Sequence, residues 1–585
     1  MLDLRLYRAS LLPFAVAVLV AAFSLSMRPA PLTGPLPPDA FNAGRAFAAL
    51  EHLAATYPNR TPGSPGDGAL ATAVARQLHA DGYQVTTIRS RVQTVLGERH
   101  IETVIASRPG TGGAIAILAH RDAVQDPSVA ALSGTAALLE LANDLSAVNP
   151  QRPLTFISTS GGSGGNAGAA IAAAALPRPL DAAIVIGDVA GTEPARPFVV
   201  PWSGDGGAAP PLLVASLNHA LSAQLGESSG AYSAAQQLAR FALPFTVGEQ
   251  GPLADAGLAA VLVQQSGELG PAADEPVAKA RLGAFGRAIL ATIEALEGAP
   301  EIATTTTREL TFGDHLLGGW AARLLVGLLI LSCAVCTLDV LARARRRRIP
   351  IARWVLWVLG WAAPFLAAGL FAKLLAWSAL LKVVPPAPVS ARELPLSGAG
   401  EAALLGVLVV FVLAALLRTS LGARTRLRGS AAADGAPVAL LAIACALAAV
   451  LWLANPYSAA LLALPLALWL VVMTRPSRHS VLAGALCALC SLVPLGLALG
   501  AEAHALAFGP LAFAWTWLLV FAGGEVGGAA LLACALAGGV AVSAALILLH
   551  PGAPEETGEQ AITVRGPVSY AGPGSLGGTD SALHR

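Results

Sequence analysis

The sequence predicts an α/β sandwich with a mostly parallel central sheet, followed by an all-α transmembrane bundle. Of the 585 residues, 55% are hydrophobic and 12% are charged, whereas a soluble globular protein carries about 25% charged residues. The apolar excess lies in the first 30 residues and after Arg308. Between these regions, short apolar runs alternate with segments of helical periodicity, which indicates strands alternating with helices.

An N-terminal anchor is predicted for residues 1–29. An apolar run at 10–27 follows Arg5 and Arg8, and no clear small-x-small cleavage site precedes the proline-rich stretch 29–38. A cleaved signal peptide is the alternative. We favour an uncleaved signal-anchor helix with both arginines on the cytoplasmic side, because basic residues are retained there.

Residues 30–310 are predicted to form one soluble domain. The domain has no cysteine, so it contains no disulfide bond in any redox compartment. The net charge of the whole chain is +1, which gives no bulk attraction toward nucleic acid, so no nucleic-acid partner is expected. The expected strands are 83–91, 100–107, 114–119, 153–159, 182–186 and 259–264, and the expected helices include 133–145 and 278–296.

Residues 311–550 are predicted to form about eight transmembrane helices, because a span needs about 20 apolar residues. The spans are placed near 318–341, 353–380, 401–417, 437–454, 458–474, 481–499, 508–523 and 527–549. Three loops after the first, third and fifth spans are rich in arginine, which places these loops in the cytoplasm. The soluble domain then falls on the extracytoplasmic side of a multi-pass protein of the cell (plasma) membrane. The tail, 551–585, is rich in Gly, Pro and Ser and is expected to be disordered.

Ionisable residues within the predicted spans are few, and they form no transporter-like constellation. We expect those in or beside spans to snorkel or to lie at the interface; they are Lys373, Lys382, Glu502, His504 and Glu525. All six cysteines lie in apolar segments, and two pairs have CxxC spacing: Cys333/Cys336 and Cys487/Cys490. Neither pair has a second pair near it in sequence, so residues of membrane helices are favoured over a metal or redox site.

Several motifs occur in order along the soluble domain. Residues 59–66 read Asn-Arg-Thr-Pro-Gly-Ser-Pro-Gly, and 119–122 read Ala-His-Arg-Asp at the end of an expected strand. A helix at 133–142, the sequence Ile-Gly-Asp at 186–188 and a turn at 256–260 follow. In this order the motifs resemble the zinc peptidase family M-twenty-eight, whose members have an aminopeptidase-like α/β fold.

The resemblance implies a pair of zinc ions joined by a bridging carboxylate, with a free glutamate that activates zinc-bound water. His120 and Asp188 match zinc-ligand positions, and Asp122 matches the carboxylate that orients the histidine. The other functional positions carry no donor atom: the bridging aspartate falls on Ala130, the general base on Gly161, a further glutamate on Gly162 and the last histidine on Gly270. A zinc pair would therefore be under-coordinated. No cofactor is expected unless the site is rearranged to bind zinc.

Three carboxylates are candidate substitutes for the lost ligands: Asp126, Glu249 and Glu268. We favour solvated loop positions for them over metal ligation. His120 and Asp122 are interpreted as a hydrogen-bonded structural pair, with residual binding of a single metal as the alternative. The glycine-rich stretch 160–168 lacks the Gly-Lys-Ser/Thr ending of a phosphate-binding loop and is interpreted as a turn.

The predicted layout is similar to that of vacuolar membrane proteases and endoplasmic-reticulum metallopeptidases, which keep their zinc ligands. It is also similar to that of the attachment subunit of the GPI transamidase, whose peptidase-like domain has lost zinc catalysis. The lost ligands favour the latter, a catalytically inactive protein that binds or scaffolds. The expected partners are membrane lipid and a peptide, a lipid-linked group or a protein held in the old cleft.

Two other functions remain open on the sequence. An active exopeptidase would use a rearranged site of His120, Asp122, Asp126 and Asp188. A transport or lipid-handling function would reside in the helices, with the soluble domain as an accessory, because a pathway can be lined by backbone and small residues.

Overall fold

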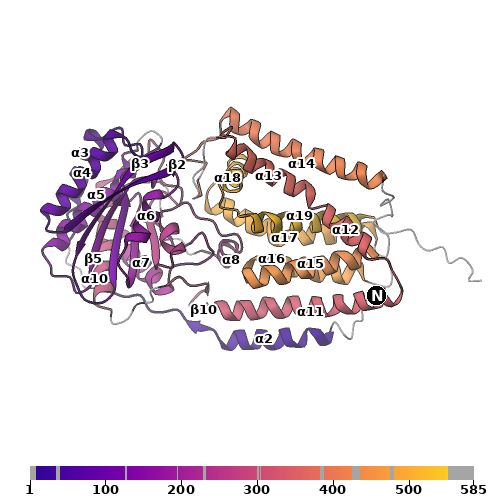
Figure 1. Ribbon diagram of the computed structural model, residues 1–585. Helices are drawn as coiled ribbons and strands as arrows, with labels where there is room; N and C mark the ends of the chain where they lie inside the picture. Colours follow the sequence, from indigo (N-terminus) through magenta and orange to yellow (C-terminus); the bar gives the residue numbers. More distant parts are fainter. Residues whose placement is uncertain are drawn as a thin grey trace, which may run out of the picture.

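The computed structural model describes residues 8–550 apart from 35–39, 125–127, 194–195, 228, 230–231, 300–301, 303–304, 382–387, 390, 425–434 and 475–479. An α/β domain lies at one end of the molecule, and a bundle of long helices extends from it (Figure 1). The expectations for Asp126, Lys382 and the tail 551–585 fall outside the described residues.

The α/β domain is built on a seven-stranded sheet in the order β2-β3-β5-β4-β6-β8-β7. The strands are β2 (Gln84–Thr94), β3 (Gly97–Arg108), β4 (Ala114–His120), β5 (Leu154–Thr159), β6 (Leu180–Ile186), β7 (Phe198–Val200) and β8 (Ala260–Gln264). The four central strands β5, β4, β6 and β8 are parallel, while β2, β3 and β7 pair antiparallel. Strands β4, β6 and β8 are apolar along nearly their whole length, as expected where both faces of the sheet are covered. The predicted mostly parallel central sheet is confirmed.

Helices cover both faces of this sheet. One layer contains α3 (Ala43–Thr56), α4 (Pro65–Ala80), α5 (Ser133–Ser146), α7 (Pro211–Leu225) and α10 (Lys279–Glu297). The other contains α6 (Ala167–Ala175), α8 (Ala234–Ala242) and α9 (Gln250–Asp255), and its apolar core continues into the bundle. Local signals set where these helices begin: Ser64 caps α4 through the Asp67 amide, and Ser233 forms a capping box with Gln236.

Seven helices among the described residues are long and apolar enough to cross a membrane. They are α11 (Gly319–Arg346), α12 (Ala352–Gly360) with α13 (Ala363–Trp377) as one span, α14 (Gly398–Arg424), α15 (Gly435–Ala454), α16 (Pro456–Met473), α17 (Val481–Ala505) and α19 (Gly528–Leu549). The N-terminal helix α2 (Leu12–Phe23) runs beside α11, and a small sheet links the two; its strands are β1 (Ser26–Met27), β9 (Leu310–Phe312) and β10 (His315–Leu317). A multi-pass membrane protein follows from these spans.

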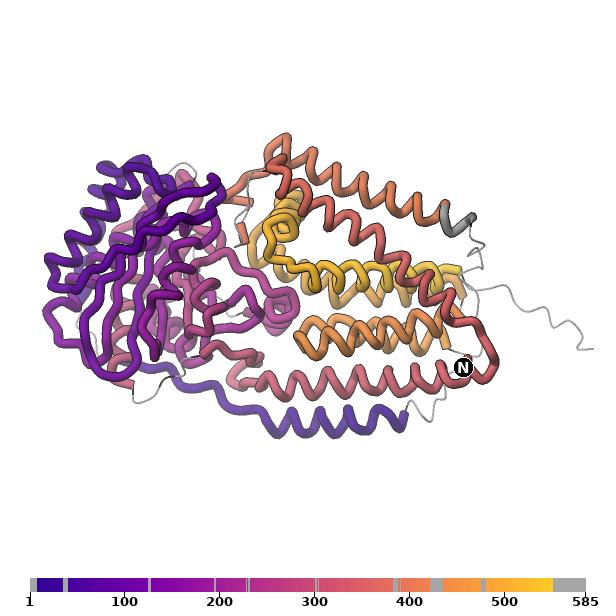
Figure 2. The backbone as a smooth tube through the Cα atoms, in the orientation of Figure 1, coloured from indigo at the N-terminus to yellow at the C-terminus, as the bar shows by residue number. Residues whose placement is uncertain are grey.

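The expected span at 508–523 is a shorter helix, α18 (Pro510–Ala522), of 13 residues. At 1.5 Å per residue it is about 20 Å long, which is less than the roughly 30 Å of a bilayer core. Helix α18 is seen nearly end-on beside the α/β domain, whereas its neighbours run along the bundle (Figures 1 and 2). The chain therefore runs along the bundle in α17, passes across the end of the bundle in α18 and runs back along the bundle in α19.

The α/β domain is attached to the bundle through α8. Asn455, between α15 and α16, donates to the Phe241 carbonyl at 2.6 Å, and Ser458 in the first turn of α16 donates to the Ala242 carbonyl at 2.6 Å. The rings of Phe241 and Tyr457 stack with centroids 4.9 Å apart. Because these contacts satisfy the last carbonyls of α8, they hold the domain in a defined position on the helices.

Candidate functional site

A pocket of about 230 Å³ lies at the carboxyl ends of the parallel strands. Its lining includes His120 at the end of β4, Gly162 after β5, Gly187 after β6 and Gln264 at the end of β8. This edge is where parallel α/β sheets bind ligands, because the loops that follow the strands converge there. The pocket therefore coincides with the place of the motifs singled out in the sequence.

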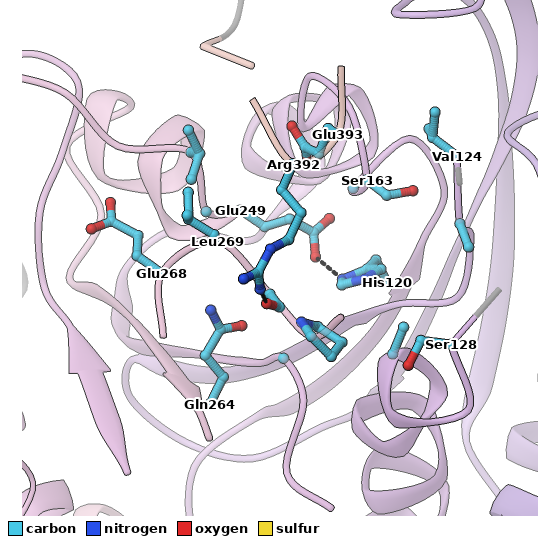
Figure 3. A pocket seen from close by; sticks show the side chains of 18 of the residues that line it. His120, Val124, Ser128, Ser163, Glu249, Gln264, Glu268, Leu269, Arg392 and Glu393 are labelled. Atoms are coloured by element: carbon cyan, nitrogen blue, oxygen red, sulfur yellow. Dashed lines mark hydrogen bonds and ion pairs between the residues drawn. The ribbon is translucent and has the colours of Figure 1, made fainter. Parts of the chain in front are cut away.

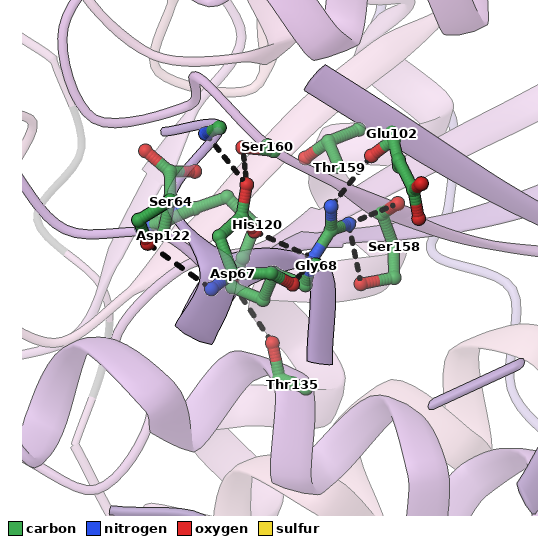
Figure 4. Close-up of polar contacts among 12 residues, drawn as sticks. Ser64, Asp67, Gly68, Glu102, His120, Asp122, Thr135, Ser158, Thr159 and Ser160 are labelled. Atoms are coloured by element: carbon green, nitrogen blue, oxygen red, sulfur yellow. Dashed lines mark hydrogen bonds and ion pairs between the residues drawn. The ribbon is translucent and has the colours of Figure 1, made fainter. Parts of the chain in front are cut away.

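Arg121 fixes the backbone that carries His120. Its side chain is fully buried and lies 2.8 Å from Asp67 in an ion pair. It also donates to the carbonyls of Glu102 at 2.6 Å and Ser158 at 3.0 Å. Thr135 donates to the His120 carbonyl at 2.9 Å (Figure 4). The end of β4 is thus tied to two neighbouring strands and two helices, so His120 has a rigid base.

His120 pairs with Glu249, the residue that precedes α9. The Glu249 carboxylate lies 3.5 Å from Nδ1 of His120 and accepts a hydrogen bond from the Thr159 hydroxyl at 2.6 Å (Figure 3). Burial alone lowers the pKa of His120, but the Glu249 carboxylate raises it to about 9, helped by the charges of Asp122 and Glu393. The Glu249 side chain is 3% exposed, so the expectation of a solvated loop carboxylate is wrong.

Gly162 makes room for this ion pair. A Cβ atom at residue 162 would lie 2.4 Å from Cβ of His120 and 2.9 Å from the Glu249 carboxyl carbon. The position where the family pattern expects a glutamate is therefore glycine, and a carboxylate from a distant segment occupies the adjacent space. The neighbouring Gly161 has φ of +77°, a conformation that favours glycine.

Asp122 stabilises the loop rather than the histidine. Its carboxylate accepts from the amides of Gly162 at 3.0 Å and Ser163 at 3.2 Å, and from the Ser163 hydroxyl at 2.5 Å. Burial raises the pKa of Asp122 despite the opposing charge of His120. The expected hydrogen-bonded pair of His120 and Asp122 is thus replaced by the pair of His120 and Glu249. Asp122 shapes the turn that the sequence analysis assigned to 160–168.

The Asp188 carboxylate hydrogen-bonds to nearby backbone amides, and Asp188 is not part of the pocket lining. One carboxylate oxygen accepts from the Ser133 hydroxyl at 3.1 Å and from the amides of Ala190 at 3.0 Å and Gly191 at 2.8 Å. Burial raises its pKa. Asp188 and the fully buried Ala130 are not among the residues that line the pocket, whereas Gly270 is. The structure does not bring Asp188 and His120 into one ligand set.

The donors present do not fit the zinc pair of the family. Among the described residues, no group of three or more His, Cys, Asp and Glu side chains is arranged to hold a metal ion. His120 and Glu249 face each other, while Asp122 and Asp188 are directed to backbone amides. A zinc ion takes about four ligands at 2.0–2.3 Å, which is more than the described residues bring together here. The six cysteines, all within described helices of the bundle, form no disulfide bond.

Two features of the pocket were not predicted from the sequence: the contribution of Arg392 and Glu393, and the buried pairing of Glu268. Arg392 and Glu393 belong to the loop between α13 and α14, yet both line the pocket (Figure 3). Glu268 also lines it, and instead of being solvated it forms a buried ion pair at 2.6 Å with Arg240 of α8. On its other side Arg240 lies 3.1 Å from Glu502 of α17. Glu502 is 1% exposed, so its carboxylate is buried between protein segments.

No protein-family model matches the chain, and no curated protein matches it. Among solved structures, a zinc aminopeptidase from Bacillus subtilis is similar at 12% identity with a TM-score of 0.36, covering 44% of this chain and 95% of that one. A glutaminyl cyclase from Porphyromonas gingivalis is similar at 17% identity with a TM-score of 0.35, covering 43% and 98%. An aminopeptidase from Aneurinibacillus shows 14% identity and a TM-score of 0.33, covering 45% and 95%. The likeness concerns the fold of part of the chain.

Proposed function

We propose that this chain is a multi-pass protein of the cell membrane whose extracytoplasmic peptidase-like domain binds a ligand without zinc-dependent cleavage. The observation that carries the proposal is the contact of Glu249 with His120 across Gly162. His120, which lines the pocket, is paired with the Glu249 carboxylate. Gly161 and Gly162 stand where the resemblance to the peptidase family implies glutamates. The membrane layout, with catalysis lost from the domain, is similar to that of the GPI transamidase attachment subunit.

The extracytoplasmic orientation is supported by charge. Arg343, Arg345 and Arg346 occupy the last turn of α11, at the end of the bundle away from the α/β domain (Figure 1). Arginine-rich ends of spans are retained in the cytoplasm. The pocket consequently opens on the other side of the membrane, where its ligand is a peptide, a lipid-linked group or a partner protein.

The metal content of the full-length protein tests the loss of zinc chemistry. After equilibration with excess zinc and desalting in detergent, we expect less than about 0.2 zinc ions per chain, because too few donors converge to hold the ion. We also expect no release of amino acids from a panel of short peptides. A soluble zinc aminopeptidase carried through the same steps is the positive control. Two zinc ions per chain, together with peptide cleavage that His120→Ala abolishes, would establish an active exopeptidase instead.

Photocrosslinking tests the binding role directly. A photoreactive amino acid at residue 131, which lines the pocket, is expected to give an adduct of defined mass in native membranes. The same amino acid at Val148, which is 54% exposed and outside the pocket lining, is the matched control. A folded protein that yields no adduct at residue 131 beyond that at residue 148 would contradict a binding function.

A further inference from the structure

A segment of the membrane bundle forms one wall of the pocket. We call residues 391–397, which precede α14, the strap. Arg392 donates to the Gly270 carbonyl, and Glu393 accepts from the Gly164 amide at 2.9 Å. Gly164 follows β5 and Gly270 follows β8, so two consecutive strap residues hold two different loops of the pocket. In Figure 3, Arg392 extends into the space between Glu249 and Gln264.

The other side of the strap is attached to α18. The Trp515 indole donates to the Leu394 carbonyl at 2.8 Å, and the Ala391 amide donates to the Thr516 hydroxyl at 3.3 Å. Trp515 is 2% exposed and lies in an apolar cluster with Leu394, Leu396 and Val95 of the turn between β2 and β3. The short helix α18 thus holds the strap through Trp515 and Thr516.

The two attachments differ in strength. On the α18 side, two hydrogen bonds and the buried Trp515 ring hold the strap, within an apolar cluster that also includes Val95 and Val124 of the α/β domain. On the pocket side, the hydrogen bond to the Gly270 carbonyl comes from Arg392, a residue exposed to solvent. Water competes for such a bond, so its net contribution to stability is small. Segments whose hydrogen bonds are exposed to solvent open locally without unfolding the protein, and the contact of Arg392 with Gly270 is of this kind.

We propose that the strap controls access to the pocket, opening from Gly164 and Gly270 while it stays attached to α18. The inference rests on the proposed function in taking the pocket as the ligand site. Since Arg392 and Glu393 line the pocket, a ligand that enters must displace or contact them. Occupancy of the pocket is thereby coupled to the loop between two membrane spans.

Cysteine accessibility tests the proposal without any ligand. Ser128 lines the pocket and is 4% exposed, and Ser128→Cys is nearly isosteric. The full-length protein is treated with a membrane-impermeant thiol reagent, and mass spectrometry follows the peptide that contains residue 128. With the strap intact, we expect slow labelling. The double substitution Arg392→Ala with Glu393→Ala is expected to raise the labelling rate at least tenfold.

Matched variants separate opening of the strap from general loosening. Arg178→Ala removes another arginine that donates to one backbone carbonyl, that of Ala256, and is expected to leave the rate at residue 128 unchanged. Val148→Cys reports a site outside the pocket and is expected to react rapidly at one rate in every background. If the double substitution lowers the melting temperature, Arg392→Lys and Glu393→Gln are used, with an intermediate rate expected.

Two results would overturn the strap as a gate. One is that, with the strap intact, the thiol introduced at residue 128 is labelled as fast as the thiol introduced at residue 148. The other is a labelling rate at residue 128 that does not respond to any strap variant. Neither result depends on zinc content or on a photocrosslinked ligand, so the gate and the proposed function can fail separately.

Discussion

Replacing Arg240 with methionine is expected to lower the free energy of unfolding by about 3–5 kcal/mol, the usual effect of removing one partner of a buried ion pair. The Arg240 guanidinium lies 2.6 Å from Glu268 and 3.1 Å from Glu502, and all three side chains are at most 4% exposed. Without the arginine, two carboxylates remain buried with no compensating cation. Thermal unfolding of the full-length protein in detergent should show a melting temperature lower by roughly 10 °C.

Neutral partners should reverse most of that loss. In the Arg240→Met background, Glu268→Gln together with Glu502→Gln removes the uncompensated charge, so the melting temperature is expected to rise again. Arg178→Met, at an exposed arginine with one backbone hydrogen bond, is the matched control and should change stability by less than about 0.5 kcal/mol. A melting temperature of Arg240→Met within about 2 °C of the unsubstituted protein would contradict the role of Arg240 as the counter-ion of Glu268 and Glu502. Two buried carboxylates without a cation should lower the melting temperature by more than that.

The location of Arg240, Glu268 and Glu502 predicts an effect on the pocket in addition to the loss of stability. Glu268 belongs to the pocket lining, Arg240 to α8, which docks on the bundle, and Glu502 to the end of α17. The pocket is thus joined to the membrane helices through a buried ionic contact as well as through the strap. In the Ser128→Cys background, Arg240→Met is therefore expected to speed labelling at residue 128 in addition to lowering stability, because the loop at 264–270 loses its anchor.

Introducing a glutamate at position 162 is expected to destabilise the protein by about 3 kcal/mol, as overpacking of a filled site does. The new Cβ would meet His120 at 2.4 Å, and the added carboxylate would meet that of Glu249. The substitution Gly162→Glu is not expected to raise the zinc content, because His120 remains paired with Glu249. Melting temperature and metal analysis on the same sample check both statements.

Companion variants identify which clash dominates. Gly162→Ala adds only the Cβ atom and measures the contact with His120, while Gly162→Glu with Glu249→Ala removes the competing carboxylate. The double variant should be more stable than Gly162→Glu alone, since residues in contact are not additive. Gly68→Ala is the matched control, because its Cβ meets nothing within 4 Å. Equal stability of Gly162→Glu and the control would mean that the loop has free space.

Much of the architecture followed from local patterns in the sequence. The strands that end at His120, Thr159, Ile186 and Gln264 were expected within a residue or two, because buried parallel strands are short continuous apolar runs. Seven of the expected spans are helices of sufficient length and apolarity. The run at 508–523 forms a shorter helix, and composition does not tell how much of an apolar run is helical or whether it lies across the end of the bundle. The structure shows that 13 residues of this run are helical, which is fewer than a span needs.

The candidate site, too, was predicted from the sequence only in part. The sequence by itself determined that a histidine stands at the end of a central strand, and that Ala130, Gly161, Gly162 and Gly270 offer no side-chain donors. These are statements about single positions, and they require no knowledge of neighbours. Which carboxylate meets His120 is a statement about two segments that are distant in the chain.

Only the tertiary structure decided that Glu249 reaches His120, that Glu268 and Glu502 share Arg240, and that Arg392 enters the pocket from the membrane bundle. In the sequence each of these residues resembles an ordinary polar position in a loop or at a helix end. Local hydrophobic periodicity reports which face of its own element a residue occupies. The burial and pairing of a charge depend on elements packed from elsewhere in the chain, because a buried charge is stable only where a partner from another segment compensates its lost hydration.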